Sequence, residues 1–352
     1  TTNTYFKNLT AVAGGTVTLT ANWTANIYTI TLDNGSATTN GTSTIYEKYD
    51  DGVYLNNSNG TLSNKMSTSA NKITVPQRKY TVTYNANTGE VATPSQTATY
   101  TFKGYYDGTT QMIGADGFIK SAFTNTKYTS NKTLNADWTA GKVTTPVPTK
   151  TGYTFIGWFD SQTGGNKIAD GNTEYTPTVD KTLWAHWTPN TDIPYVVKHW
   201  QQKLTGTVGT HNSTNYDLKD TENLTGTADG EVTPAFKTYT GFTAEGTVQT
   251  VTIAANGSTV VNYYYKRNSY GVTLNKGTGI DTVTGAGTYL YGANVTINAT
   301  LKEGYTWSKW TGTHNNQTTQ NYTFTMPASA VTDTANATYT ASVTITRSDY
   351  NT

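Results

Sequence analysis

The chain contains the pattern Leu-x-Ala-x-Trp three times, as LTANW at 19–23, LNADW at 134–138 and LWAHW at 183–187. Alternate side chains of a β-strand point to opposite faces of its sheet, so the Leu, Ala and Trp of each copy share one face. The two variable positions fall on the other face, where solvent accepts most residue types. The pattern predicts three half-buried strands, each with its indole turned into a core.

Composition is typical of a β protein and narrows the range of functions. Only 13% of the 352 residues are charged, and good helix formers are sparse beside Thr, Asn, Gly and Tyr. The 24 Lys and Arg against 23 Asp and Glu give a net charge of +1 without a basic stripe, which argues against a nucleic-acid groove. The absence of cysteine excludes disulfides and thiolate metal sites and favours a bacterial secreted protein. No apolar run approaches the roughly 20 residues that a membrane-spanning helix needs.

A second repeated element combines alternating aromatic residues with a turn. It occurs as ATYTFKGYYDG (98–108), KTGYTFIGWFD (150–160) and KEGYTWSKWTG (302–312), which align without gaps. Alternating strands that lead into Asn/Gly turns lie further upstream, as YTITLDNGS (28–36) and YTVTYNANTG (80–89). This repetition predicts a string of small modules rather than two or three large domains.

The pattern changes after Trp187, where Pro189 and Pro194 mark a joint. We expect YVVKHWQQKL (195–204) to form a strand, DLKDTENLTG (217–226) a turn or one short helix, and NGSTVVNYYYKR (256–267) a hairpin-entering strand. A final unit begins at YGVTLNKGTG (270–279) and ends in NATYTAS (336–342). Its closing Ala335-x-Ala337-x-Tyr339 is similar to the Trp pattern, with Tyr replacing Trp.

These motifs carry a family resemblance over nearly the whole chain. Residues 80–187, with GYTFIGWFD and LWAHW, resemble internalin B-type repeats, also called Listeria–Bacteroides repeats, of multidomain bacterial surface proteins. Residues 192–267 resemble the mucin-binding-protein module through YVVKHWQQ, DTENLTG and VVNYYYKR, and residues 268–341 resemble a divergent internalin repeat through LNKGTG, GYTWSKWTG and FTMPA. The resemblance implies a mainly β fold of small β-grasp-like α+β modules, joined in tandem in an elongated multidomain array.

The expected organisation contains two incomplete units. The unit at 26–79 lacks its own Leu-x-Ala-x-Trp strand, and the unit at 140–190 lacks the usual first strand of the family. The partial units at 1–25 and 26–79 either pack together or reflect truncation and recombination. The expected ranges are a partial repeat at 1–25, internalin B-type repeats at 26–79, 80–139 and 140–190, a mucin-binding-protein-like module at 191–267, a divergent repeat at 268–345 and a linker at 346–352.

No catalytic, cofactor-binding or metal-binding constellation is apparent, so we expect no enzyme and no cofactor. The histidines have no metal-site spacing, and we expect His186 to be solvated; the others are His199, His211 and His314. The Asp-Gly pairs indicate turns rather than catalytic or calcium sites. Aromatic residues remain, and Tyr263-Tyr264-Tyr265 must place rings on both faces of a sheet. Exposed rings would either bind sugars or a protein partner, or pack along their own sheet.

The leading hypothesis is therefore a non-enzymatic stalk or adhesive region of a bacterial cell-surface protein, which spaces or presents a distal binding head. The alternative is a glycan- or host-glycoprotein-binding module centred on 191–267. The expected partners are a host glycoprotein, a glycan or another surface protein, with no nucleic acid, no membrane insertion and a monomeric state. The expected location is the bacterial cell surface or cell wall, with export and anchor signals outside this stretch. The identity of any ligand and of the residues that bind it stays open.

Overall fold

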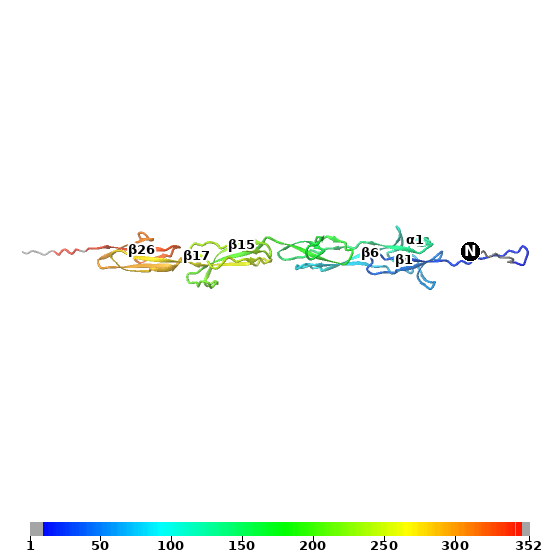
Figure 1. Ribbon diagram of the computed structural model, residues 1–352, viewed down its shortest axis with the longest axis horizontal. Coiled ribbons are helices and arrows are strands. Elements are labelled where there is room, and N and C mark those ends of the chain that lie inside the picture. The colour runs from blue at the N-terminus through cyan, green and yellow to red at the C-terminus, as the bar shows by residue number, and fades with distance from the viewer. Residues whose placement is uncertain (1–9, 342, 347–352) are drawn as a thin grey trace, which may run out of the picture. The chain divides into compact units, whose positions relative to one another are not determined.

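A computed structural model describes residues 10–341 and 343–346 and is almost entirely β (Figure 1). The five-residue α1 (Ser121–Asn125) is the only α-helix in that part of the chain. The strands form several separate sheets in two compact units. Unit 1 holds the chain up to residue 150 with 155–187, and unit 2 holds 151–154 with the chain from 188 onward. The prediction of a mainly β fold built from several sheets is confirmed.

Unit 1 is built on one large sheet in the order β11-β10-β13-β5-β6-β8-β1-β2-β3-β4, with β7 paired to β6 and a separate β9–β12 pair. Its strands are β1 (Ile27–Asp33), β2 (Thr44–Lys48), β3 (Gly52–Ser58), β4 (Thr61–Lys65), β5 (Arg78–Asn85), β6 (Ser95–Asp107), β7 (Thr110–Gly114), β8 (Lys132–Thr139), β9 (Val143–Thr144), β10 (Tyr153–Phe159), β11 (Lys167–Ala169), β12 (Glu174–Tyr175) and β13 (Lys181–Pro189).

The large sheet of unit 1 contributes side chains to two separate hydrophobic cores. The first core gathers side chains from β1, β2, β3, β7, β8 and α1 and from the second half of β6, including Ile30, Phe102 and Leu134. The second gathers side chains from β5, β10 and β13, including Tyr84 and Trp158. Strand β6 belongs to both halves, because its first residues pair with β5 and its last residues pair with β8.

Each Trp strand in unit 1 pairs in parallel with the first strand of the preceding sequence repeat. Strand β8 lies beside β1, with Leu134 opposite Leu32. Strand β13 lies beside β5, with Leu183 opposite Tyr84. The pairing thus runs across the expected boundaries at 79/80 and 139/140. Strand β8 thus serves as the last strand that the 26–79 unit lacks, and β5 serves as the first strand that the 140–190 unit lacks.

The Trp strands at β8 and β13 turn their apolar face inward, as the sequence predicts. Leu134 and Leu183 are fully buried. Trp138 and Trp187 are half-buried against the two cores. Each indole meets a phenylalanine of the neighbouring aromatic strand edge to face, at 5.3 Å between ring centroids for the first pair and 5.5 Å for the second. The prediction is confirmed for these two copies.

For the copy at 19–23 the prediction is wrong. Residues 15–26 belong to no strand. Leu19 is 65% exposed and Trp23 is 91% exposed, so neither reaches a core. The physical reason is that a Trp strand is buried only when it pairs in parallel with the first strand of a repeat. In the described residues, β1 and β5 are already paired with β8 and β13.

Unit 2 contains sheets in the orders β15-β14-β19-β17, β16-β18, β22-β20-β26-β24 and β21-β23-β25. Its strands are β14 (Ile193–Gln202), β15 (Tyr216–Gly226), β16 (Glu231–Val232), β17 (Phe242–Ala244), β18 (Val251–Thr252), β19 (Val260–Arg267), β20 (Ser269–Lys276), β21 (Ile280–Thr284), β22 (Gly287–Leu290), β23 (Asn294–Leu301), β24 (Tyr305–Gly312), β25 (Tyr322–Thr325) and β26 (Val331–Tyr339). Here too the first and last long strands are parallel neighbours, β14 with β19 and β20 with β26.

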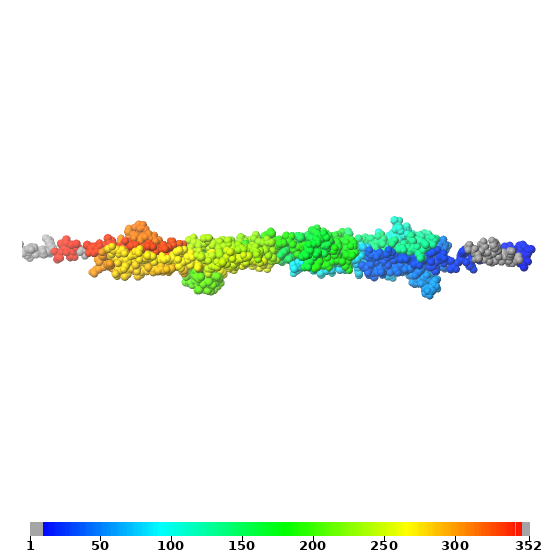
Figure 2. All heavy atoms as spheres, viewed as in Figure 1, coloured from blue at the N-terminus to red at the C-terminus, as the bar shows by residue number. Residues whose placement is uncertain are grey.

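The expectation of a turn or short helix at 217–226 is wrong, because β15 spans this segment as an edge strand paired with β14. Its polar residues alternate between exposed and half-buried positions, which an edge strand facing solvent accepts. The loop between β14 and β15 protrudes from unit 2 (yellow-green in Figure 2). Tyr263 and Tyr265 of β19 are buried, and Tyr264 on the opposite face stacks on His211 of this loop at 3.9 Å. The outward ring of Tyr264 thus packs along its own sheet.

The burial of the Trp strands makes a direct stability prediction. Trp138→Ala or Trp187→Ala should lower the free energy of unfolding of unit 1 by about 3 kcal/mol, the low end for a deleted core indole because both are half-buried. Trp23→Ala is the matched control and should change it little, since that ring is 91% exposed. Differential scanning calorimetry of the full chain measures all three. Equal losses for the three variants would contradict the assignment of the cores.

Candidate binding pocket

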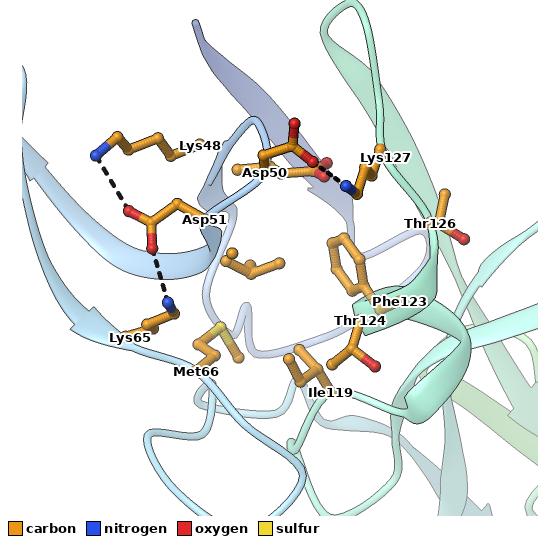
Figure 3. Close-up of a pocket in the computed structure, with 13 residues that line it drawn as sticks. Lys48, Asp50, Asp51, Lys65, Met66, Ile119, Phe123, Thr124, Thr126 and Lys127 are labelled. Carbon is orange, nitrogen blue, oxygen red and sulfur yellow. Dashed lines mark hydrogen bonds and ion pairs between the residues drawn. The ribbon is translucent and has the colours of Figure 1, made fainter. Parts of the chain in front are cut away.

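A cavity of about 180 Å³ opens in unit 1 where the β2–β3 turn meets α1 and the segment after it (Figure 3). The turn forms because Asp50 adopts a left-handed backbone (φ 61°) and Gly52 an extended positive φ of 144°. A residue other than glycine is strained at the second position. Strands β2 and β3 therefore reverse sharply, and the turn faces α1 across the cavity.

The floor of the cavity is apolar and its rim is charged. Val53, Met66, Ile119 and Phe123 form the floor, and each is at most 4% exposed. The rim carries lysines and carboxylates in equal number, namely Lys48, Lys65, Lys127, Glu47, Asp50 and Asp51.

Most of the rim charges are paired with one another. Asp51 accepts from Lys65 at 2.7 Å and lies 3.1 Å from the Lys48 ammonium. The Tyr54 hydroxyl donates to the same carboxylate at 3.0 Å. Lys127 forms an ion pair with Asp50 across the cavity (Figure 3). The rim thus carries no excess charge that would select a strongly anionic or cationic ligand.

The pKa values of two pocket carboxyl groups, Asp51 and Glu47, are shifted in opposite directions. Hydrogen bonds from Lys65, then Lys48 and Tyr54, hold the pKa of Asp51 far below its usual range. Burial raises the pKa of Glu47, although the Tyr128 amide and the charge of Lys127 oppose this shift. Glu47 is only 4% exposed and accepts from that amide at 3.3 and 3.4 Å. Its charge is thus weakly compensated.

The threonine hydroxyl groups that line the cavity donate hydrogen bonds to backbone carbonyls. The Thr124 hydroxyl donates to the Ser121 carbonyl and the Thr126 hydroxyl donates to the Ala122 carbonyl, both at 2.8 Å. These bonds satisfy the end of α1. The arrangement can hold a small apolar group against the floor with polar contacts at the rim. Sequence reasoning interpreted Asp51-Gly52 only as a turn, and nothing in the pattern of β2 distinguishes Glu47 from an ordinary strand residue.

The histidines lie apart and each has a local contact. His186 is half-buried and stacks on Phe159 at 3.9 Å, so the side chain is only partly solvated. His211 stacks on Tyr264, and His314 lies 2.7 Å from a buried oxygen of Asp333. Within residues 10–341 and 343–346, no group of three or more His, Asp, Glu or Cys side chains is arranged to hold a metal ion.

His199 is fully buried and belongs to a polar network in unit 2 that reaches the surface at Glu222 and Lys237. Its Nδ1 lies 2.8 Å from the Tyr265 hydroxyl and its Nε2 lies 3.0 Å from a Glu222 oxygen. Burial lowers the pKa of this histidine, although the Glu222 charge opposes the shift. Lys237 completes the network with an ion pair of 2.8 Å to Glu222, which holds the pKa of that carboxyl low. Because its polar groups bond one another, the network stabilises the sheet between β14, β15 and β19.

Two family descriptions match parts of the chain. Residues 122–186 match the Listeria-Bacteroides repeat domain, and residues 270–342 match the divergent InlB B-repeat domain. The chain therefore contains internalin B-type repeats in both units, as the resemblance predicts. The first match runs from α1 into β13 and crosses the expected boundary at 139/140. The mucin-binding-protein-like module at 191–267 stays a prediction.

Internalin H of Listeria monocytogenes is 36% identical to the chain over 139 residues. The match covers 34% of the chain and 25% of Internalin H, so the chain spans about a quarter of that relative. Together with the repeat matches, this shows that the matched parts of the chain are internalin-type repeats.

Solved structures with a measurable likeness include the Bacillus anthracis TIE protein and a streptococcal ancillary pilin. The first has 9% identity and a TM-score of 0.30, over 76% of this chain and 53% of that one. The second has 7% identity and a TM-score of 0.15, over 74% and 99% respectively. Such low scores carry no argument about fold or function. In the described part of the chain, no helix has the length and apolar character to cross a bilayer.

The shifted pKa values of Glu47 and Asp51 predict opposite effects of pH on the stability of the fold. Because the pKa of Glu47 is raised, its contribution to stability is present below its ordinary pKa of 4.5 and is lost as pH rises through the raised value. Glu47→Gln keeps an acceptor for the Tyr128 amide and should raise the melting temperature near pH 7. Asp51→Asn is the control with the opposite sign, because its lowered pKa stabilises the fold above its ordinary value of 3.8. Thermal melts from pH 3 to 8 measure both; a lower melting temperature for Glu47→Gln at pH 7 would contradict the assignment.

Proposed function

We propose that this chain is a non-enzymatic stalk or adhesive region of a bacterial cell-surface protein, which spaces or presents a distal binding head outside the cell or at its wall. The observation that carries the proposal is the pairing of first and last strands. The described chain contains four parallel strand pairs, each of a first long strand with a last long strand. They are β1 with β8, β5 with β13, β14 with β19 and β20 with β26.

This geometry resists extension. Tension enters such a module at the start of its first strand and leaves at the end of its last strand. When these strands are parallel neighbours, tension slides one along the other and stretches all of their evenly spaced hydrogen bonds together. An antiparallel pair pulled at one paired end opens one bond at a time. The β14–β19 ladder registers six residue pairs from Val196–Val260 to Gln201–Tyr265, which would share the tension.

The connections between modules are short, which suits a tensile role. Strand β19 ends at Arg267 and β20 begins at Ser269. The Arg267 side chain also donates from Nη1 to the Tyr291 carbonyl at 2.8 Å and from Nε to the Gln202 carbonyl at 2.7 Å. A short connection held by such bonds transmits tension without a slack linker. No part of this role requires catalysis or self-association, and we propose a monomeric, non-enzymatic chain.

Single-molecule force spectroscopy with two attachment geometries tests this role. The chain has no cysteine, so paired cysteines give unique handles. Pro194→Cys with Lys266→Cys pulls β14 and β19 in shear, and both positions are exposed. Pro194→Cys with Thr225→Cys is the matched control, because these residues are opposite each other in the antiparallel β14–β15 pair. We expect the shear pair to need a several-fold higher unfolding force. Equal forces would count against a mechanical role.

A second candidate function is glycan binding within the 191–267 region. A groove of about 320 Å³ is formed by this region together with Tyr291. It is lined by aromatic rings and cations, and by no carboxylate: Gln201, Lys219, Tyr239, Thr240, Phe242, Arg267 and Tyr291. The Arg267 guanidinium lies 4.9 Å from the centre of the Phe242 ring. Rings and cations together suit a sugar with an anionic substituent, from a host glycoprotein or from another surface.

Glycan arrays that carry sialylated, sulfated and neutral sugars test this candidate on the full chain. We expect binding to the anionic sugars, reduced at least about tenfold by Lys219→Glu through charge reversal at the groove. Lys302→Glu, at an exposed lysine outside the groove, is the matched control and should bind as the parent does. Absence of binding across all three classes would leave only the spacing role.

A further inference from the structure

We infer that residues 17–24 are the last strand of a further internalin-type module, and that they dock in parallel beside the first strand of a partner module that lacks its own Trp strand. The inference starts from sequence identity at matched positions. VTLTANWT (17–24) shares Thr, Leu, Ala, Trp and Thr, at the same spacing, with KTLNADWT (132–139) and KTLWAHWT (181–188).

Both of the other copies occupy one kind of place. Strand β8 lies between the parallel β1 and the antiparallel β6, and β13 lies between the parallel β5 and the strand β10. In each place the leucine is fully buried, and the indole meets a phenylalanine edge to face. A segment with the same inward residues fits the same place, because the inward face of a strand specifies its burial and register.

The copy at 17–24 has no such place in this structure. Leu19 is 65% and Trp23 is 91% exposed, an unusual state for two large apolar side chains on one face of a pattern. Trp23 borders an open hollow of about 460 Å³ together with Tyr28 and Tyr49, so the apolar surface extends onto unit 1. A segment with one apolar face that lies outside any strand ladder can still pair with the open edge of a sheet.

The kind of partner that residues 17–24 pair with follows by elimination. Every first strand among the described residues already has a parallel partner, namely β1, β5, β14 and β20. A second copy of the chain has the same places filled and could accept residues 17–24 only by giving up β8 or β13. The partner is therefore a module of the same class with a vacant last-strand place. It should present an alternating first strand such as Tyr-Thr-Ile-Thr-Leu (28–32) and an aromatic strand whose phenylalanine meets Trp23.

A transplant tests whether residues 17–24 can be a Trp strand. Three substitutions turn β8 into the 17–24 sequence within the full chain: Lys132→Val at the start of the strand, and Asn135→Thr and Asp137→Asn on its outward face. They remove the partly exposed ion pairs Lys132–Asp107 and Lys103–Asp137, and such pairs near the surface contribute little. We expect the thermal transition of unit 1 to persist within a few degrees of the parent. Loss of that transition would overturn the inference, whatever the next experiment shows.

An extended chain tests the docking itself. A copy of 27–78, joined by Asn-Gly to a copy of 100–131, is placed directly before Val17 of the chain. The joint is a two-residue hairpin turn, because Arg78 and Tyr100 are cross-strand partners. This copy offers a first strand and an aromatic strand but no Trp strand. Leu19→Cys, the only thiol, then reports burial through its rate of reaction with a maleimide.

We expect Leu19→Cys to react at least about tenfold more slowly in the extended chain, as a thiol in a protected strand does. Thr20→Cys faces outward and should stay reactive, which separates docking from general protection. As a folding control, Val17→Lys, Thr20→Asn and Asn22→Asp give the extension the β8 sequence. Protection with the β8 sequence but not with the native 17–24 sequence would overturn the inference. If neither sequence is protected, the transplant alone decides.

Discussion

The parallel pairing of a first strand with a last strand is the constraint on which the rest of the structure depends. Parallel neighbours cannot be joined by a tight turn, so the chain must cross the module before the last strand takes its place. In unit 1 this crossing is long enough to contain the start of the next module. Strand β8 therefore reaches β1 only after β5 and the first half of β6 have entered the second core.

This arrangement couples the two cores of unit 1. Strand β6 spans both, with its first residues beside β5 and its last residues beside β8. Small modules of this size bury a modest share of their surface and are marginal alone, so a shared strand contributes stability that neither core has by itself. A shared strand and short connections also leave few places where tension can lengthen the chain without breaking a ladder. Stability and the proposed mechanical role thus have one structural origin.

Local features were predictable from sequence and long-range pairing was not. Strict alternation located β1, β5, β8, β13 and β14, because the period of two is a local property. The choice of partner is not local. β1 and β5 have nearly the same alternation, and so do β8 and β13, so the sequence alone gives no preference between pairing within a repeat and pairing across repeats. The polar edge strand β15 was mistaken for a turn because its Asp and Asn residues are typical of turns. The pocket beside α1 depends on segments that are distant in sequence, which explains why Glu47 gave no signal.

Site-specific cross-linking tests the exchanged pairing most directly. The chain has no cysteine, and Thr83, Thr133 and Thr182 are all exposed on their strands. Thr83 lies opposite Thr182 in the β5–β13 pair, whereas pairing within the 80–139 repeat would bring it to Thr133. The full chain with Thr83→Cys and Thr182→Cys should form an intramolecular link with a short bifunctional reagent, detected by peptide mass spectrometry. The pair Thr83→Cys with Thr133→Cys should not. The reverse result would contradict the exchange of strands between repeats.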